Sequence, residues 1–173
     1  MIKTFYPDDY VSSVYSIDFD ALYSQGYRGI IFDIDNTLVP HGAPATPQAR
    51  QLFRRLLHTG FKTLVLSNNK EPRVKSFAQA VKATAYIHKA NKPAKAGYKK
   101  AMKLMGTNTE NTLFVGDQLF TDIWGAKRTG IKSILVEPVQ KWHEEPQIIL
   151  KRLPEALVLF FYSRSHPNPP LPH

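Results

Sequence analysis

Two carboxylates spaced two residues apart follow the first strongly apolar run of the chain, residues 30–32. A short β-branched run is typical of a buried strand in a parallel sheet, and such sheets bind ligands outside the carboxyl ends of their strands. An aspartate at that edge can attack phosphorus directly, and a second one can donate and accept protons. This spacing predicts phosphoryl transfer through an aspartyl-phosphate, with Asp33 as the nucleophile and Asp35 as the general acid and base.

The same carboxylates have a simpler interpretation, in which Asp and Asn at the end of a strand only cap a turn. Two aspartates one residue apart on an extended strand point to opposite faces, so joint action on one substrate requires a turn just after Asp33. Asn36, Thr37 and the Pro-His-Gly segment 40–42 can supply that turn.

A second apolar run, residues 63–66, ends at Ser67, Asn68 and Asn69. A hydroxyl group with nearby backbone amides can hold the non-transferring oxygens of a phosphoryl group, and we predict that contact for Ser67. The alternative role for Ser67 is a helix N-cap, because Glu71-Pro72 is typical of a first helical turn.

Lys92 directly precedes Pro93 at the start of a predicted helix. A lysine in this position can neutralise both an attacking carboxylate and a phosphoryl group, and we predict this role for Lys92. The residue also belongs to a cluster of lysines between positions 89 and 100, and such clusters are usually solvated surfaces.

Asp117 follows the apolar run 112–116, and Asp122 lies five residues later. Hard oxygen ligands at a strand edge that must also accept phosphate imply Mg²⁺, which typically uses one or two carboxylates and keeps several waters. Asp117 is expected to bind the ion directly. Asp122 can either cap the following helix or orient Asp117 and a metal-bound water, and we favour the second role.

These four motifs, in this order, resemble the haloacid dehalogenase (HAD) superfamily of aspartate-nucleophile phosphatases over roughly residues 27–136. The resemblance implies that Mg²⁺ is bound by Asp33, the main-chain carbonyl of Asp35 and Asp117, with Asp122 outside the direct ligands. The candidate phosphate-binding residues are Thr37, Ser67, Asn68 and Lys92.

More detailed features of the sequence indicate which subfamily of the HAD superfamily the chain resembles. The Lys92-Pro93 pair and the pattern Gly-Asp-x-x-x-Thr-Asp-x-x-Gly-Ala-Lys over residues 116–127 resemble subfamily IIIA. The segment that leads into residues 33–40 contains Pro7, Tyr10-Val11, Val14-Tyr15 and Ile17. It resembles the YqeG family within this subfamily, which is related to mitochondrial-type phosphatidylglycerophosphate phosphatases.

Strands and helices are expected to alternate, with strands at 29–34, 62–67, 84–88, 112–116 and 131–136 and helices at 47–58, 72–82, 94–105 and 120–128. This alternation predicts right-handed βαβ units in an α/β domain, and the resemblance implies a HAD-like Rossmannoid fold of three layers with a central parallel sheet. Gly60, Gly106 and Gly130 fall just past three of the helices, where a left-handed residue is expected. Residues 1–137 are expected to form the hydrolase core with its lead-in, and residues 138–173 an extension whose proline-rich last residues are disordered.

The spacing between the motifs bears on the size of the substrate. Each of the intervals between Thr37, Ser67 and Lys92 is filled by one helix and one strand. HAD relatives that act on small metabolites often carry a cap domain in one of these intervals, so the resemblance implies an open, capless site. Such a site suits a phosphate on a large or surface-bound molecule, or a lid supplied by a second subunit of a homo-oligomer.

The chain has a formal net charge of +9, which favours anionic partners such as nucleic acid or an acidic lipid surface. It has no cysteine, no apolar leader and no apolar run of spanning length, so we expect a cytoplasmic protein, either soluble or peripheral to the membrane. Residues 157–162 are apolar and lie among Lys151, Arg152 and Arg164. They can dock on an anionic membrane or pack on the domain, and packing is favoured.

The sequence therefore predicts a magnesium-dependent phosphomonoester hydrolase that forms an aspartyl-phosphate. Two alternatives come from other classes. One is a phosphatidylglycerophosphate-type lipid phosphatase at the membrane surface. The other is a HAD-scaffold protein that binds RNA or ribosomes, in which catalysis is incidental.

Overall fold

The computed structural model describes residues 2–140 and 146–166. Its strands are β1 (Asp9–Val11), β2 (Gly29–Phe32), β3 (Lys62–Leu66), β4 (Ala85–Ile87), β5 (Thr112–Gly116) and β6 (Lys132–Val136). Its α-helices are α1 (Phe19–Ser24), α2 (Pro47–Thr59), α3 (Glu71–Val81), α4 (Lys95–Met105), α5 (Trp124–Thr129) and α6 (Pro146–Ser165). The shorter helices are η1 (Ile2–Phe5) and η2 (Val14–Ser16), which are 3₁₀-helices, and η3 (Leu119–Ile123), which is a π-helix.

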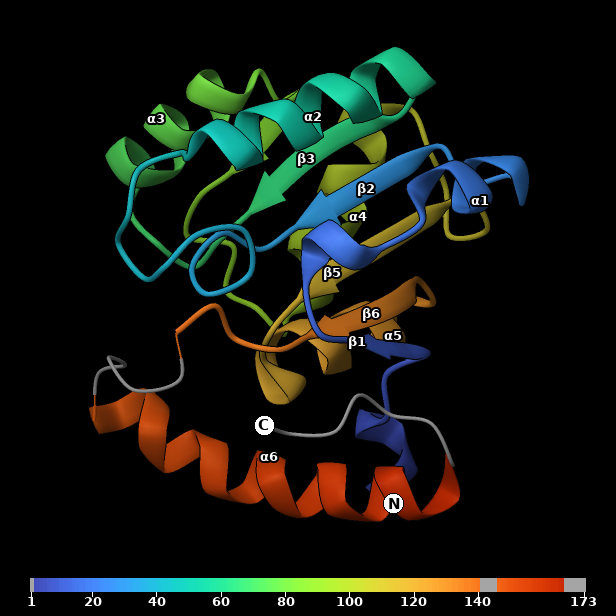
Figure 1. Cartoon of the computed structure of the whole chain (residues 1–173), viewed down its shortest axis with the longest axis vertical. Helices are drawn as coiled ribbons and strands as arrows, with labels where there is room; N and C mark the ends of the chain where they lie inside the picture. The colour runs from blue at the N-terminus through green and yellow to red at the C-terminus, as the bar shows by residue number, and fades with distance from the viewer. Residues whose placement is uncertain (1, 141–145, 167–173) are drawn as a thin grey trace.

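The strands form a single sheet in the order β1-β6-β5-β2-β3-β4, and every neighbouring pair is parallel. Figure 1 shows β3, β2, β5, β6 and β1 following one another from α2 to α6. The predicted α/β fold with a central parallel sheet is confirmed. Strand β1 was not predicted, because three residues at a sheet edge are too few to show a period.

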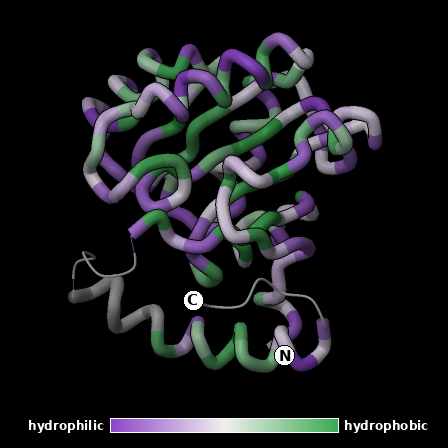
Figure 2. Tube along the Cα trace, in the orientation of Figure 1, coloured by the Kyte–Doolittle hydropathy of each residue, from purple (hydrophilic) through white to green (hydrophobic). Residues whose placement is uncertain are grey.

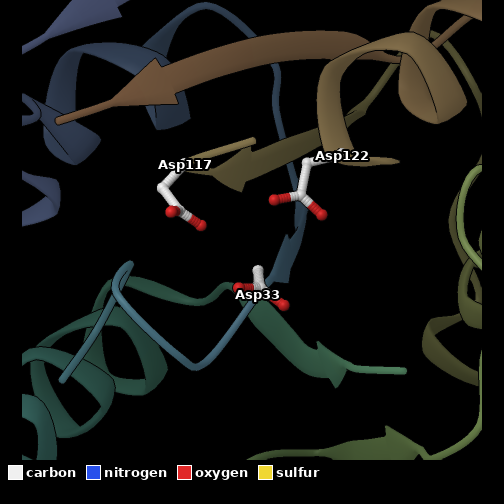
Figure 3. Close-up of side chains that lie close together, drawn as sticks. All are labelled: Asp33, Asp117 and Asp122. Carbon is white, nitrogen blue, oxygen red and sulfur yellow. The ribbon is translucent and has the colours of Figure 1, made fainter. Parts of the chain in front are cut away.

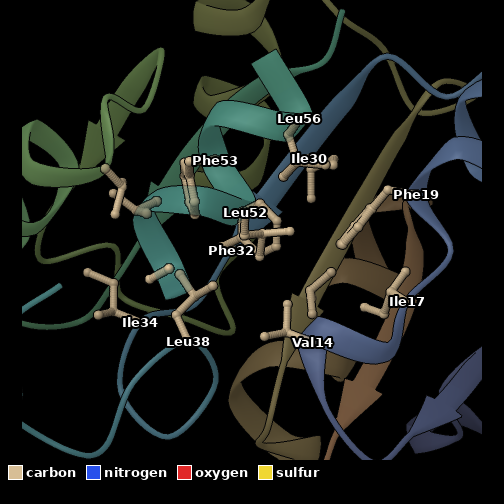
Figure 4. Close-up of a cluster of buried hydrophobic side chains, with 14 of the residues drawn as sticks. Val14, Ile17, Phe19, Ile30, Phe32, Ile34, Leu38, Leu52, Phe53 and Leu56 are labelled. Atoms are coloured by element: carbon tan, nitrogen blue, oxygen red, sulfur yellow. The ribbon is translucent and has the colours of Figure 1, made fainter. Parts of the chain in front are cut away.

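Successive side chains of a strand point to opposite faces of the sheet, and β2 shows this directly. Ile30 and Phe32 join one apolar cluster with α1, α2 and α3, whereas Ile31 joins a second cluster with α4 and α5. Figure 4 shows Phe32 lying against Leu52 and Phe53 of α2 in the first cluster. Helices therefore cover both faces of the sheet, which gives the expected three layers.

The connections that determine access to the sheet edge are short. The only helix between β2 and β3 is α2, and the only one between β3 and β4 is α3. No cap domain interrupts either connection in these fully described segments. These two connections therefore carry no cap domain over the carboxyl ends of the strands, as the resemblance implies.

The helix predicted at 120–128 differs from the observed structure. The chain there forms η3 and then α5, and the Ile123 N–H donates to the carbonyl of Gln118, five residues earlier (3.2 Å). Such a π-turn adds one residue to a helical turn and changes the direction of the side chains on it. Asp122 lies on this turn, so the irregularity falls at a predicted site residue.

The packing predicted for residues 157–162 is correct for only one face of α6. Val158 and Tyr162 are buried against the domain, and Val158 shares an apolar cluster with Leu119 of η3. Phe160 and Phe161 lie on the outer face, where they are 54% and 41% exposed. A helix can bury only the stripe that faces its neighbours, so these two phenylalanines contribute little to the core.

Figure 2 shows apolar colours along the described C-terminal half of α6, on the outside of the molecule. Within the described part of the chain, however, every helix is too short or too polar to cross a bilayer. The proline-rich residues 167–172, expected to be irregular, lie outside the described residues.

Candidate active site

Four neighbouring strands bring the predicted residues to one edge of the sheet. Asp33 follows β2, Ser67 follows β3, Lys92 lies in the loop after β4, and Asp117 follows β5. Asp33, Ser67 and Lys92 line a cavity of about 210 Å³ together with Asp35 and other polar residues of the same edge. Residues that are far apart in the sequence meet here because parallel strands present their carboxyl ends on the same side.

A larger cavity of about 540 Å³ lies among β1, α1 and α6 and contains three aspartates. Asp8 forms an ion pair with Lys127, and Asp9 forms one with Lys132. Asp18 accepts a hydrogen bond from the first turn of α1. These carboxylates stabilise the fold through ion pairs and a helix cap, so the smaller cavity is the candidate site.

Lys92 connects two of the aspartates. Its ammonium lies 2.6 Å from Asp33 Oδ1 and 2.6 Å from Asp122 Oδ1. All three side chains are buried. Figure 3 shows Asp33, Asp117 and Asp122 converging, and one carboxylate oxygen of each lies within 4.8 Å of one from the other two. A cluster of lysines usually forms a solvated surface, but Lys92 is buried and does not belong to such a surface.

This environment changes the ionisation of the buried groups. Burial raises the pKa of Asp33 to about 7, because the effect of Lys92 only partly offsets burial and the nearby charge of Asp122. Burial alone would lower the pKa of Lys92, but Asp122 and Asp33 raise it above its ordinary value. Lys92 is therefore a permanent cation, and a second cation would further favour the ionised form of Asp33.

Such a cation could be held at Asp33 Oδ2, because Lys92 contacts the other carboxylate oxygen, Oδ1. Thr37 Oγ1 lies 3.5 Å from Asp33 Oδ2 and 3.3 Å from Asp117 Oδ1, so these two carboxylates meet beside the same hydroxyl group. The donors are all oxygens, which suits a hard divalent cation. Asp33 and Asp117 therefore fit as direct metal ligands, a role expected for Asp117 from its place after a strand and for Asp33 from the resemblance to the HAD superfamily.

Asp122 is engaged differently. Its Oδ1 accepts from Lys92, and its Oδ2 accepts from the Gln118 N–H (3.2 Å). The N-cap residue of α5 is Ile123, so Asp122 does not cap that helix. Tyr98 fixes the same turn, since its single hydroxyl hydrogen is shared between the carbonyls of Thr121 (2.9 Å) and Asp122 (3.1 Å).

Asp35 lies where the chain turns. Asn36 adopts a left-handed backbone with φ 62°, which asparagine tolerates, so the predicted turn after Asp33 is present. Both carboxylate oxygens of Asp35 are held. Oδ1 accepts from the Gly42 N–H (2.8 Å) and from Arg73 Nη2 (2.9 Å), and Oδ2 accepts from Asn69 Nδ2 (2.8 Å).

Ser67 does not have the alternative role of a helix cap. The N-cap residue of α3 is Lys70, and Ser67 Oγ instead accepts from the Asn69 N–H (3.1 Å) within the loop. The side chain of Asn68 is bonded to the main chain of Lys92, because Oδ1 accepts from its N–H (2.7 Å) and Nδ2 donates to its carbonyl (3.3 Å). The β3–α3 loop therefore also positions the lysine.

Other side chains also form hydrogen bonds with the predicted site residues, among them those of Asn69, Arg73 and Tyr98. Asn69 was visible as the third residue of the Ser-Asn-Asn motif. Arg73 and Tyr98 lie on helices, and their contacts depend on how α3 and α4 are rotated on the sheet. The apolar periodicity of each helix indicates which face packs on the sheet, but not which side chain reaches the site.

Comparisons with known proteins agree with this arrangement. The family described as HAD-hydrolase-like matches residues 89–156. Probable phosphatase YqeG of Bacillus subtilis is 38% identical over 141 residues, which cover 80% of this chain and 81% of that protein. Phosphatidylglycerophosphate phosphatase 1, chloroplastic/mitochondrial, of Arabidopsis thaliana is 30% identical over 154 residues, covering 82% of this chain and 44% of that protein.

Among solved structures, the cobalt-bound deoxy-D-mannose-octulosonate 8-phosphate phosphatase of Haemophilus influenzae has a TM-score of 0.53 at 13% identity, covering 66% of this chain and 70% of that one. At this identity the likeness shows the fold alone. The family follows from the Bacillus relative, which the chain matches over most of both lengths. The chain belongs to the YqeG phosphatase family of the HAD superfamily.

Proposed function

We propose that this protein is a magnesium-dependent phosphomonoester hydrolase that acts through an aspartyl-phosphate. The observation that carries the proposal is the position of Asp33, a buried carboxylate at a strand end with Lys92 at 2.6 Å on one side and Asp117 on the other. A nucleophilic carboxylate needs cations around it, because it must approach a phosphate that is itself negative.

In the first half-reaction, a carboxylate oxygen of Asp33 attacks phosphorus and the bond to the leaving oxygen breaks, while Asp35 gives its proton to that oxygen. In the second, Asp35 takes a proton from water as the water oxygen attacks phosphorus. The bond between phosphorus and Asp33 then breaks, which releases phosphate and restores both side chains.

The remaining residues hold the phosphoryl group. Ser67 and Thr37 offer hydroxyl groups, and Lys92 offers its ammonium. Because the side chain of Asn68 is bonded to Lys92, we assign the backbone N–H of Asn68 to the phosphate. A bound Mg²⁺, held by Asp33, the carbonyl of Asp35 and Asp117, would neutralise charge on the phosphoryl oxygens.

The test compares Asp33→Asn with the wild-type protein on para-nitrophenyl phosphate. The amide is nearly isosteric but cannot attack phosphorus, so turnover should be lost while the far-ultraviolet circular dichroism spectrum stays the same. Substantial hydrolysis by a folded Asp33→Asn protein would overturn the covalent mechanism. If the wild-type protein hydrolyses none of the phosphomonoester classes tested, the alternative of a binding protein without catalysis is favoured.

A second candidate function is hydrolysis of a lipid phosphate at an anionic membrane surface. The plant relative carries the name phosphatidylglycerophosphate phosphatase 1, although this chain spans only 44% of it. The outer face of α6 supports the same function, because it exposes a stripe of large apolar side chains: Leu153, Leu157, Phe160 and Phe161. The guanidinium of Arg164 lies over the Phe160 ring, 5.3 Å from its centroid.

The charge of α6 and of the whole chain favours an anionic lipid surface as the partner of this face. The only acidic residue of α6 is Glu155, which is buried and accepts from the Leu119 N–H (2.9 Å). An exposed apolar stripe without acidic side chains, on a chain of net charge +9, suits the surface of an anionic bilayer.

The experiment is sedimentation with vesicles of phosphatidylglycerol and phosphatidylcholine, compared with phosphatidylcholine alone. We expect salt-sensitive binding to the anionic vesicles that Phe160→Ser/Phe161→Ser removes. The matched control is Leu57→Ser/Leu104→Ser, which changes exposed apolar residues on other helices. Equal binding by both double variants, or no binding by the wild-type protein, would reject this surface.

A further inference from the structure

The carboxylate of Asp35 is held by donors from three places in the chain. The Gly42 N–H belongs to the loop that follows Asp35 itself, Asn69 lies in the β3–α3 loop, and Arg73 lies in the first turn of α3. A carboxylate offers about four acceptor positions, two on each oxygen. Among the described residues, two donors occupy Oδ1 and one occupies Oδ2, so the remaining position lies on Oδ2.

Arg73 is itself held in place. It lies in the first turn of α3, and its guanidinium lies 5.6 Å from the centroid of the Phe77 ring, one turn further along. Phe77 is part of the core. The side chains of Arg73 and Asp35 are only 20% and 13% exposed. The Nε–H of Arg73 has no acceptor among the described residues, so the hydrogen bond to Asp35 is the main polar contact of this side chain.

A comparison within the chain shows how unusual this pair is. Arg55 forms an ion pair with Asp20 between α2 and α1, but those side chains are 56% and 59% exposed. Pairs of that kind are screened by water and contribute little. The Arg73–Asp35 pair lies instead beside the cavity that contains Asp33, where the direction of a carboxylate determines whether its proton can reach a substrate oxygen.

We infer that Arg73 is a positioning residue that holds Asp35 so that Oδ2 carries the proton exchanged with the leaving oxygen and then with water. The inference rests on the proposed function, because it assigns to Arg73 the orientation of the acid and base of that reaction. Arg73 anchors Oδ1 through a planar, fixed donor, so rotation of the carboxylate is restricted and the open acceptor position stays on Oδ2 of a side chain that lines the cavity. Asn69 favours the same orientation, because its Nδ2 donates to Oδ2.

This arrangement makes a prediction that a merely structural ion pair does not make. A poor leaving group needs protonation, whereas a good one departs with little help. Loss of Arg73 should therefore slow hydrolysis of phenyl phosphate much more than hydrolysis of para-nitrophenyl phosphate, two substrates of nearly the same shape. The second half-reaction is common to both substrates and should slow equally.

The experiment measures kcat/KM for both aryl phosphates with wild-type protein, Arg73→Met and Arg73→Lys, and with Arg55→Met as the matched control. Methionine keeps an apolar stem against Phe77 without the charge. We expect Arg73→Met to lose about 10-fold to 100-fold on phenyl phosphate, in the range that misplacement of a catalytic group costs, and much less on para-nitrophenyl phosphate. Arg73→Lys should restore part of the loss, and Arg55→Met should match wild type.

A double-mutant cycle completes the test. In an Asp35→Asn background, Arg73→Met should cause no further loss, because a residue that acts through Asp35 has nothing left to orient. Equal losses on both substrates, or full additivity with Asp35→Asn, would overturn the inference and leave the proposed function intact. A wild-type protein that hydrolyses neither substrate nor any other phosphomonoester would overturn the proposed function and the inference together.

Discussion

Removal of the Lys92 ammonium tests the electrostatics of the site through stability, without any assumption about the substrate. In Lys92→Met, the stem volume is nearly kept but Asp33 and Asp122 lose a partner that lies 2.6 Å from each. The side chains of Lys92 and Asp122 are only 4% and 1% exposed, so water cannot replace the lost charge. Breaking a buried pair from one side typically costs about 3–5 kcal/mol.

A loss of that size is a large share of the ~5–15 kcal/mol by which domains are usually stable. It should appear in urea unfolding of the purified protein in a chelating buffer at neutral pH, followed by circular dichroism. A double variant, Lys92→Met/Asp122→Asn, separates the charge effect from the packing effect. We expect it to be more stable than Lys92→Met, since it buries one fewer unpaired carboxylate.

Two results would refute this reasoning. One is a loss below about 1 kcal/mol in Lys92→Met, which is the size typical of an exposed ion pair. The other is a double variant less stable than both single variants, which would mean that shape rather than charge dominates the site. Added Mg²⁺ should stabilise Lys92→Met if Asp33 and Asp117 bind the ion, because ligand binding to the native state raises its stability.

Three other outcomes are expected. Asp8→Asn should lower the melting temperature at pH 7, and the difference from wild type should shrink as the pH falls below about 4. Burial raises the pKa of Asp8, but hydrogen bonds from Lys127 and Ser133 bring this pKa below its ordinary value. The ionised carboxylate therefore stabilises the fold at neutral pH, and this stabilisation is lost in acid. Ca²⁺ should bind yet support little turnover compared with Mg²⁺ in an assay after chelation, because it prefers more ligands and a looser geometry. Phe160→Ser/Phe161→Ser should change thermal stability by less than about 1 kcal/mol, since both rings are exposed.

Much of the site could be predicted because its main residues are local features of strand ends. An apolar run followed by a polar residue marks the place where a buried strand leaves the sheet, and parallel strands place all such ends at one edge. Asp33, Ser67 and Asp117 follow this rule directly. The glycines after α2, α4 and α5 were equally predictable, and Gly60, Gly106 and Gly130 have φ values of 111°, 68° and 83°.

Contacts between elements could not be predicted in the same way. Whether Arg73 reaches Asp35 depends on the rotation and tilt of α3, which result from the packing of Phe77 and its neighbours in the core. The orientation of α6 also depends on how the helix packs against the domain. The sequence of α6 is apolar on most sides, so its periodicity did not show that Phe160 and Phe161 would both face away from the domain.

The glycines near Asp117 show how a sequence motif encodes the geometry of a site. A Cβ atom at Gly116 would lie 2.5 Å from Asp122 Oδ2, so a larger residue would displace the carboxylate that accepts from Lys92. A Cβ at Gly125 would overlap the hydroxyl of Tyr98, the group that donates to the carbonyl of Asp122. Both glycines therefore preserve the position of one aspartate on the π-turn. Gly116 leaves space for the carboxylate of Asp122, and Gly125 leaves space for the tyrosine that bonds to its main-chain carbonyl, so the small residues of this motif carry information about the geometry of the site.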